Sequence, residues 1–159
     1  MIPICLISGI LTLCFASAVF ILSSQTAGDS GQTSGYISKT VFRVLFGDES
    51  EYSPEEASRL YDLTDSAVRT CAHFCEYLLL GASSSSFALS LSVLLGGGDP
   101  KKSVIIAAAG CVLFAVSDEI HQIFVPGRAF EISDIVTDSA GVLIGCLLIY
   151  LFRRKLIRQ

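Results

Sequence analysis

The fold is decided by the stretch from Ser117 to Gly145, which reads SDEIHQIFVPGRAFEISDIVTDSAGVLIG. This charged stretch lies between two apolar runs, Val104 to Val116 and Val142 to Phe152. Such runs predict membrane-spanning helices, joined here by a turn at Pro126-Gly127. Because ionisable groups inside a membrane are costly, a cluster of them beside two spans indicates a functional site.

The composition of the whole chain is that of a membrane protein. Of its 159 residues, 52% are hydrophobic and only 16% are charged, whereas soluble domains carry about 25% charged residues. The C-terminal segment 153–158 holds four cations and no acid, which is typical of a cytoplasmic membrane face and does not indicate nucleic-acid binding. The six cysteines lie in or beside apolar runs without metal-ligand spacing, so we expect small, buried core residues.

Working outward from the opening stretch, four spans are predicted at about residues 4–22, 70–95, 103–124 and 134–152. The first contains Ala16-Ser17-Ala18, which resembles a signal-peptidase site. No basic segment precedes this run, and it continues to Leu22, so we expect a retained helix rather than a cleaved leader of residues 1–18. The run Ser83 to Ser86 is interpreted as a helix-packing surface. Gly141 and Gly145 likewise predict close helix packing.

The extracytoplasmic insert 26–65 separates the first two spans. Residues 26–35 are turn formers and predict a loop. Residues 36–47 carry apolar side chains on one helical face, which predicts a short amphipathic helix on the membrane or packed on the protein. The fold prediction is therefore all-α, a single domain over residues 1–159. It is a compact bundle of four transmembrane helices with short extracytoplasmic amphipathic helices between helices one and two.

Helix start signals refine the end of this insert. Ser53, Pro54 and Glu56 form a capping-box pattern, which predicts a helix over about residues 54–63. Thr64 or Asp65 would then cap a separate helix that enters the membrane.

The positions of the basic residues predict the orientation. With four spans, Lys101-Lys102 and the basic segment 153–158 lie on the same side of the membrane. The positive-inside rule places that side, and hence both termini, in the cytoplasm. The insert 26–65 and the loop 125–132 would then face the extracytoplasmic side.

This topology brings polar groups from all four spans to the outer leaflet. Helical spacing supports the convergence, since His73 and Glu76 are i, i+3 and Asp134 and Asp138 are i, i+4. The predicted site comprises Gln25 near the first span, Arg69, His73 and Glu76 on the second, Asp118, Glu119 and Gln122 on the third, Arg128 on the loop, and Asp134 and Asp138 on the fourth.

The chemistry expected of this site centres on His73. A histidine oriented by a carboxylate acts as a general base or a nucleophile, although a core histidine with satisfied hydrogen bonds is the alternative. Neighbouring side chains on a helix point about 100° apart. We therefore assign Glu119 to the site with Gln122, and Asp118 as the second candidate. The alternative for both acids is ion pairing with arginines.

The remaining charged groups have mixed interpretations. Arg128, at the mouth of the site, suits a phosphate clamp together with Arg69. Asp134 has two equal interpretations, a helix cap or a functional group. His121 is interpreted as an interfacial histidine and Glu131 as a solvated loop charge. No cofactor is expected. The acids and His73 could ligate a divalent ion, but no closed metal-ligand motif is present.

The residues RTCAHFCEYLLLG (69–81), SDEIHQIFVPGR (117–128) and ISDIVTDSAGVLIG (132–145) resemble the VanZ-like family of small bacterial membrane proteins. The resemblance covers essentially the whole chain. Thr70 stands where members often have lysine, and Asp138 where asparagine is common. The family resemblance implies a protein of the bacterial cell membrane that is associated with teicoplanin-type lipoglycopeptide resistance. A proposed wider relationship groups the family with membrane enzymes that exchange or cleave lipid head groups.

Three functions follow as hypotheses. The first is an enzyme acting on a lipid or polyprenyl-phosphate-linked head group at the outer leaflet, with His73, Glu119, Asp118 and Glu76 as catalytic groups. The second is a binding protein for a lipid-linked cell-wall precursor or for the antibiotic's lipid tail. The third, a small transporter, is disfavoured because the polar groups lie in one half of the bilayer.

Overall fold

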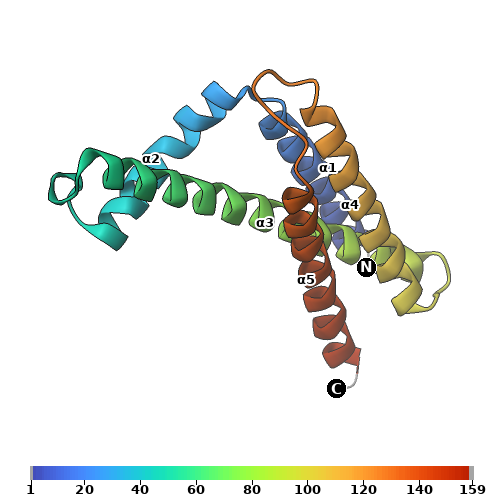
Figure 1. The fold of residues 1–159 in the computed structure, drawn as a ribbon. Coiled ribbons are helices and arrows are strands. Elements are labelled where there is room, and N and C mark those ends of the chain that lie inside the picture. Colours follow the sequence, from blue (N-terminus) through green and yellow to red (C-terminus); the bar gives the residue numbers. More distant parts are fainter. Residues whose placement is uncertain (1, 158–159) are drawn as a thin grey trace.

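The computed structural model describes residues 2–157, all in helices or in the short links between them (Figure 1). The elements are α1 (Ile2–Ser23), α2 (Ala27–Phe46), the 3-10 helix η1 (Glu49–Glu51), α3 (Pro54–Leu94), α4 (Pro100–Gln122) and α5 (Ile132–Ile157). Helices α1, α3, α4 and α5 are long and apolar enough to cross a membrane. The predicted all-α fold with four spans is confirmed, and the protein is a multi-pass membrane protein.

Helix starts follow the capping signals. The Ser53 hydroxyl accepts a hydrogen bond from the Glu56 amide, and the Glu56 carboxylate accepts one from the Ser53 amide, with Pro54 in the first turn. Asp99 caps α4 in the same way, since its carboxylate accepts from the Lys101 amide at 2.9 Å. These bonds satisfy amide groups that have no partner inside the helix.

The prediction of two helices over residues 54–94 is wrong, because α3 is one continuous helix of 41 residues. Thr64 does not cap a new helix. Its hydroxyl donates to the Leu60 carbonyl one turn earlier, at 2.7 Å. At 1.5 Å per residue α3 is about 60 Å long, roughly twice the thickness of a bilayer core. Its first half therefore projects from the bundle together with α2 (Figure 1).

The predicted loop over residues 26–35 is also wrong, since α2 begins at Ala27. Asp65 on α3 accepts hydrogen bonds from Ser34 at 3.0 Å and from Ser38 at 2.7 Å. The Tyr61 hydroxyl donates to the Gly35 carbonyl at 3.4 Å. These tertiary contacts outweigh the weak helix propensity of a glycine- and serine-rich segment. The amphipathic helix predicted over 36–47 is the second half of α2.

The spans pack around a small core, and the closest approach is between α3 and α5. A Cβ added at Gly81 would lie 2.5 Å from the Val142 carbonyl oxygen, and one at Gly141 would lie 2.5 Å from the Phe74 carbonyl oxygen. Gly145 meets the Leu78 backbone in the same way. The predicted glycine surface is confirmed, and its partner is α3. Ser83 and Ser85 are buried within α3, consistent with the packing interpretation.

The prediction that the cysteines are buried is correct for three of the six. Cys5, Cys111 and Cys146 are buried, whereas Cys14, Cys71 and Cys75 are exposed, and all six are free thiols. Apolar residues need not face the protein core in a membrane span, because lipid covers the outer surface of the helix.

The start of α1, the end of α5 and the α3–α4 link lie at one end of the bundle, and the link between α4 and α5 lies at the other (Figure 1). The first end carries Lys101, Lys102, Arg153, Arg154 and Lys155, while Arg158, the last of the predicted basic segment, lies outside the described residues. Which end faces the cytoplasm stays a prediction from these charges.

Candidate functional site

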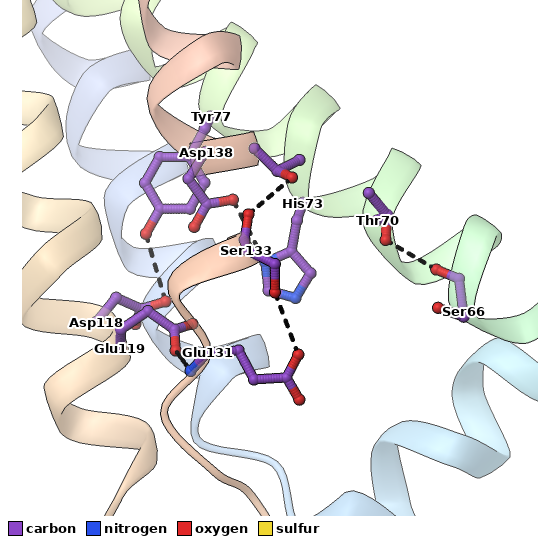
Figure 2. Close-up of polar contacts among 10 residues, drawn as sticks. Ser66, Thr70, His73, Tyr77, Asp118, Glu119, Glu131, Ser133 and Asp138 are labelled. Atoms are coloured by element: carbon purple, nitrogen blue, oxygen red, sulfur yellow. Dashed lines mark hydrogen bonds and ion pairs between the residues drawn. The ribbon is translucent and has the colours of Figure 1, made fainter. Parts of the chain in front are cut away.

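The central contact of the site joins α3 to α5. His73 Nδ1 lies 3.7 Å from Asp138 Oδ1. Figure 2 shows the two side chains, one from each helix, joined by a dashed line. Asp138 is fully buried, and neither of its carboxyl oxygens has a hydrogen-bond partner among residues 2–157. The His73 side chain is 19% exposed. The contact has ion-pair distance but is too long for a hydrogen bond, and His73 Nδ1 likewise has no hydrogen-bond partner among residues 2–157. The carboxylate favours an imidazole that turns Nδ1 toward it, so Nε2 is the nitrogen left for a ligand.

A second buried contact joins α3 to α4. The Tyr77 hydroxyl donates to Asp118 Oδ2 at 3.3 Å, and both side chains are almost completely buried (Figure 2). Tyr77 lies one turn after His73, on the same helical face. The bond fixes Asp118 within the interior of the bundle.

Glu119 contacts the α4–α5 link rather than His73. Its Oε2 accepts a hydrogen bond from the Glu131 amide at 3.0 Å (Figure 2). Glu119 is fully buried, and Gln122, one turn later, is 2% exposed. The geometry therefore assigns Glu119 to holding the start of α5 against the end of α4. The carboxylate that faces His73 is Asp138, the position at which asparagine is common in the family.

His73 lines a cavity of about 240 Å³ between α1, α2, α3 and the α4–α5 link. Arg69, Glu76 and Arg128 contribute its charged wall, together with Gln25. Its apolar wall consists of Val19, Leu22, Ile37, Val68 and Ala72. A cavity lined by two arginines and by several aliphatic side chains suits a ligand with an anionic group and a hydrocarbon part.

Arg128 is held at this cavity by the link between α1 and α2. Its Nε donates to the Gln25 carbonyl at 3.4 Å. Burial lowers the pKa of Arg128, and Arg69 lowers it further, while Asp134, Glu119 and Asp118 raise it. An arginine stays protonated throughout the physiological range even so. The site therefore keeps a fixed positive charge close to Arg69.

A second opening of about 420 Å³ lies on the other side of His73, between α3 and the start of α5. Arg69 and His73 line both openings. Polar side chains line the second one, including Asp62, Asp65, Ser66, Thr70, Glu131, Ser133, Asp134 and Thr137. His73 is thus accessible from an amphipathic side and from a polar side.

The predicted site residues divide into two groups. Gln25, Arg69, His73, Glu76 and Arg128 line the first cavity, and Asp134 lines the second. Asp118, Glu119, Gln122 and Asp138 are buried and line neither. Direct contact of Asp118 or Glu119 with a ligand is therefore not supported by this geometry.

Asp134 lies in the first turn of α5, and its side chain makes no capping hydrogen bond within residues 2–157. Because Asp134 lines the second opening, its interpretation as a site residue is favoured. Glu131 is exposed, as predicted for a loop charge, and accepts from the Ser133 hydroxyl at 3.4 Å.

His121 lines neither of the two cavities, and its interfacial position stays a prediction. Its ring stacks on Phe20 with centroids 4.7 Å apart, and Nε2 lies 3.1 Å from the Ser24 hydroxyl. It therefore joins α4 to the end of α1.

Sequence reasoning missed Tyr77, Asp62 and Asp65. Tyr77 could have been found from its i+4 spacing to His73. Asp62 and Asp65 could not, because they were expected to lie on or beside a helix boundary that does not exist. Among residues 2–157 no three His, Cys, Asp or Glu side chains are arranged to hold a metal ion.

Comparison with known protein families gives a match over most of the chain. A family model described as VanZ/LLP1 matches residues 9–153. These residues include most of α1 and α5, all of α3 and α4, and every residue of the predicted site. No curated protein and no solved structure matches the chain. Through the VanZ family the match links the protein to glycopeptide resistance. The chain belongs to the VanZ/LLP1 family.

Proposed function

We propose that this protein acts on a lipid or polyprenyl-phosphate-linked head group of the bacterial cell envelope. It does so at the outer leaflet and contributes to teicoplanin-type resistance. One observation carries the proposal. His73, oriented by Asp138, lines the same cavity as Arg69 and Arg128. A positioned imidazole beside two permanent cations is an arrangement suited to phosphoryl-group chemistry.

The cavity walls suggest how the substrate is held. Arg69 and Arg128 bind the phosphate oxygens by charge-assisted hydrogen bonds. The aliphatic wall formed by α1, α2 and α3 accommodates the first part of the hydrocarbon chain, which continues into the bilayer. The polar opening on the far side of His73 admits water or an acceptor hydroxyl.

The reaction proceeds by attack on phosphorus. As general base, His73 Nε2 takes the proton from water or from the acceptor hydroxyl, whose oxygen then attacks the phosphorus atom. The bond from phosphorus to the leaving oxygen breaks, and that oxygen takes the proton back from the imidazolium. Asp138 stabilises the imidazolium, and the arginines stabilise the charge that develops on the phosphoryl oxygens. The alternative role of His73, as nucleophile, uses the same Nε2 atom.

The acids predicted to be catalytic take supporting roles in this mechanism. Asp118 and Glu119 hold α3, α4 and the α4–α5 link in register through Tyr77 and the Glu131 amide. Glu76 and Asp134 lie at the cavity walls and orient the arginines or the acceptor.

A second candidate function is binding without chemistry, for example of a lipid-linked cell-wall precursor or of the antibiotic's lipid tail. It is favoured by the burial of Asp118 and Glu119 behind the cavity, which leaves fewer acid–base groups at the ligand than expected.

The test is a lipid and cell-wall-precursor profile of cells expressing the wild type, His73→Ala or His121→Ala. His121 provides a matched control because it is the other histidine of the chain and lies outside the cavity. We expect a shift in one head-group species that His73→Ala abolishes and His121→Ala retains. The same profile for wild type and His73→Ala would refute the enzymatic proposal. Saturable lipid binding by both would then favour the binding protein.

A further inference from the structure

A third cavity, of about 340 Å³, lies at the opposite end of the bundle from His73. It is enclosed by the end of α3, the start of α4 and the end of α5. Leu89 and Val93 form an apolar wall, and Tyr150 lies beside them. Lys101, Arg153 and Arg154 bring three cations to the same cavity.

The charge of this cavity is not balanced by the protein. Asp99 is the one acid in its lining, and its carboxylate caps the start of α4 by accepting from the Lys101 amide at 2.9 Å. Within residues 2–157, none of the three cations lies within ion-pair distance of a carboxylate. Three like charges around one cavity repel each other, and an anion would relieve this repulsion.

Arg153 is held in place at the cavity wall. Its guanidinium donates to the hydroxyl of Ser90, and Ser90 is fully buried on α3. The Arg153 side chain is itself half-buried. A guanidinium carries five donors in a rigid fork, so the remaining donors stay available to a ligand. The fixed geometry lowers the entropic cost of binding.

We propose that this cavity binds the phosphate of an anionic lipid head group in the leaflet opposite the candidate site. The cations contact the phosphate, and the Leu89 and Val93 wall contacts the glycerol and the first carbons of the acyl chains. Membrane-side phosphate sites of this kind combine basic side chains with adjacent apolar surface. The cavity shares no residue with the His73 site. The proposal of a lipid site here can therefore be tested independently of the function proposed for His73.

The chain offers matched controls against a general charge effect. Lys102 and Lys155 are sequence neighbours of Lys101 and Arg154 at the same end of the bundle, but they do not line the cavity. The positive-inside rule treats all these cations alike. A specific binding site, by contrast, requires the cations that line the cavity and does not require the two that do not.

The experiment measures lipid binding to the purified full chain in neutral detergent by native mass spectrometry. Short-chain phosphatidylglycerol is the probe, and phosphatidylcholine and inorganic phosphate are the comparison ligands. Arg153→Gln/Arg154→Gln is compared with Lys102→Gln/Lys155→Gln, which removes the same charge. We expect the first pair to weaken phosphatidylglycerol binding by about tenfold or more, the effect of one or two lost charge-assisted hydrogen bonds. We expect the second to weaken it less than about twofold.

Ser90→Ala keeps all three cations and releases Arg153, so we expect a severalfold weaker affinity with unchanged charge. Equal losses in the two double variants would overturn the proposal, because they would indicate unspecific charge attraction. Inorganic phosphate bound as tightly as phosphatidylglycerol would overturn the assignment to a lipid. Melting temperatures measured without lipid confirm that each variant is folded.

Discussion

Replacing Gly141 by alanine tests the contact that holds His73 against Asp138. Gly141 lies one turn after Asp138 on α5 and packs on the backbone of α3 beside His73. A Cβ at this position would lie 2.5 Å from the Phe74 carbonyl oxygen and 3.1 Å from the Leu78 amide nitrogen. Neither backbone atom can rotate away. Because ordinary contact begins at 3.4 Å, α5 would have to move about 0.9 Å away from α3.

Two losses follow from this movement. Forcing extra volume into a packed interface costs about 1–3 kcal/mol of unfolding free energy. The same displacement would widen the separation of 3.7 Å between His73 Nδ1 and Asp138 Oδ1. We therefore expect Gly141→Ala to lower both stability and the activity proposed for His73.

The free energy of unfolding can be measured by titrating the protein from mild detergent into dodecyl sulfate and following the loss of helix. Gly110→Ala is the matched control, because a Cβ at Gly110 on α4 meets nothing within 4 Å. It should be neutral or more stable by up to about 1 kcal/mol, from helix propensity alone. A difference between the two variants of less than about 0.5 kcal/mol would refute the close-packing argument.

Three further predictions concern the supports of the site. Tyr77→Phe leaves Asp118 without its recorded partner and should cost about 1–3 kcal/mol in the same titration; an unchanged unfolding free energy would contradict the role of the Tyr77–Asp118 bond. Asp65→Ala removes the acceptor of Ser34 and Ser38, so amides of α2 should exchange with solvent faster than in the wild type; equal exchange rates would mean that α2 does not depend on Asp65. Hydrogen bonds from Ser50 lower the pKa of Asp48 from its ordinary value of 3.8, so the η1 cap persists above that value and is lost as the pH falls through the lowered pKa. The amide shift of Ser50 should accordingly titrate with a midpoint below 3.8, and a midpoint at or above it would contradict the cap.

The spans were predictable from the sequence because hydrophobic length and charge placement are local properties. The helix boundaries in the insert were not. Thr64 and Asp65 carry the same hydroxyl and carboxylate groups whether they cap a helix or continue one. Whether Asp65 caps a helix or continues one depends on α2, because the hydroxyls of Ser34 and Ser38 donate hydrogen bonds to its carboxylate. Contacts between distant segments therefore decided a question that local signals left ambiguous.

The membership of the site was predictable, but not the contacts within it. Spacing placed His73 and Asp138 in the same half of the bilayer. Which carboxylate faces the imidazole depends on the rotation and depth of α5 against α3, and the backbone contacts at Gly81, Gly141 and Gly145 set both. The glycine pattern was visible in the sequence, whereas its partner helix was not. The spacing of Glu119 to Gln122 places Glu119 at the site as a catalytic group, whereas in the structure its carboxylate accepts a hydrogen bond from the Glu131 amide.

The central claim is that His73, Arg69 and Arg128 form one reactive, lipid-accessible site. It is tested most directly by head-group release from liposomes of bacterial lipid extract that contain the purified protein, followed by mass spectrometry. We expect release by the wild type and by His121→Ala, and loss of release in His73→Ala and in Arg128→Gln. Release that continues unchanged in His73→Ala, or no release by the wild type from any lipid of the extract, would contradict it.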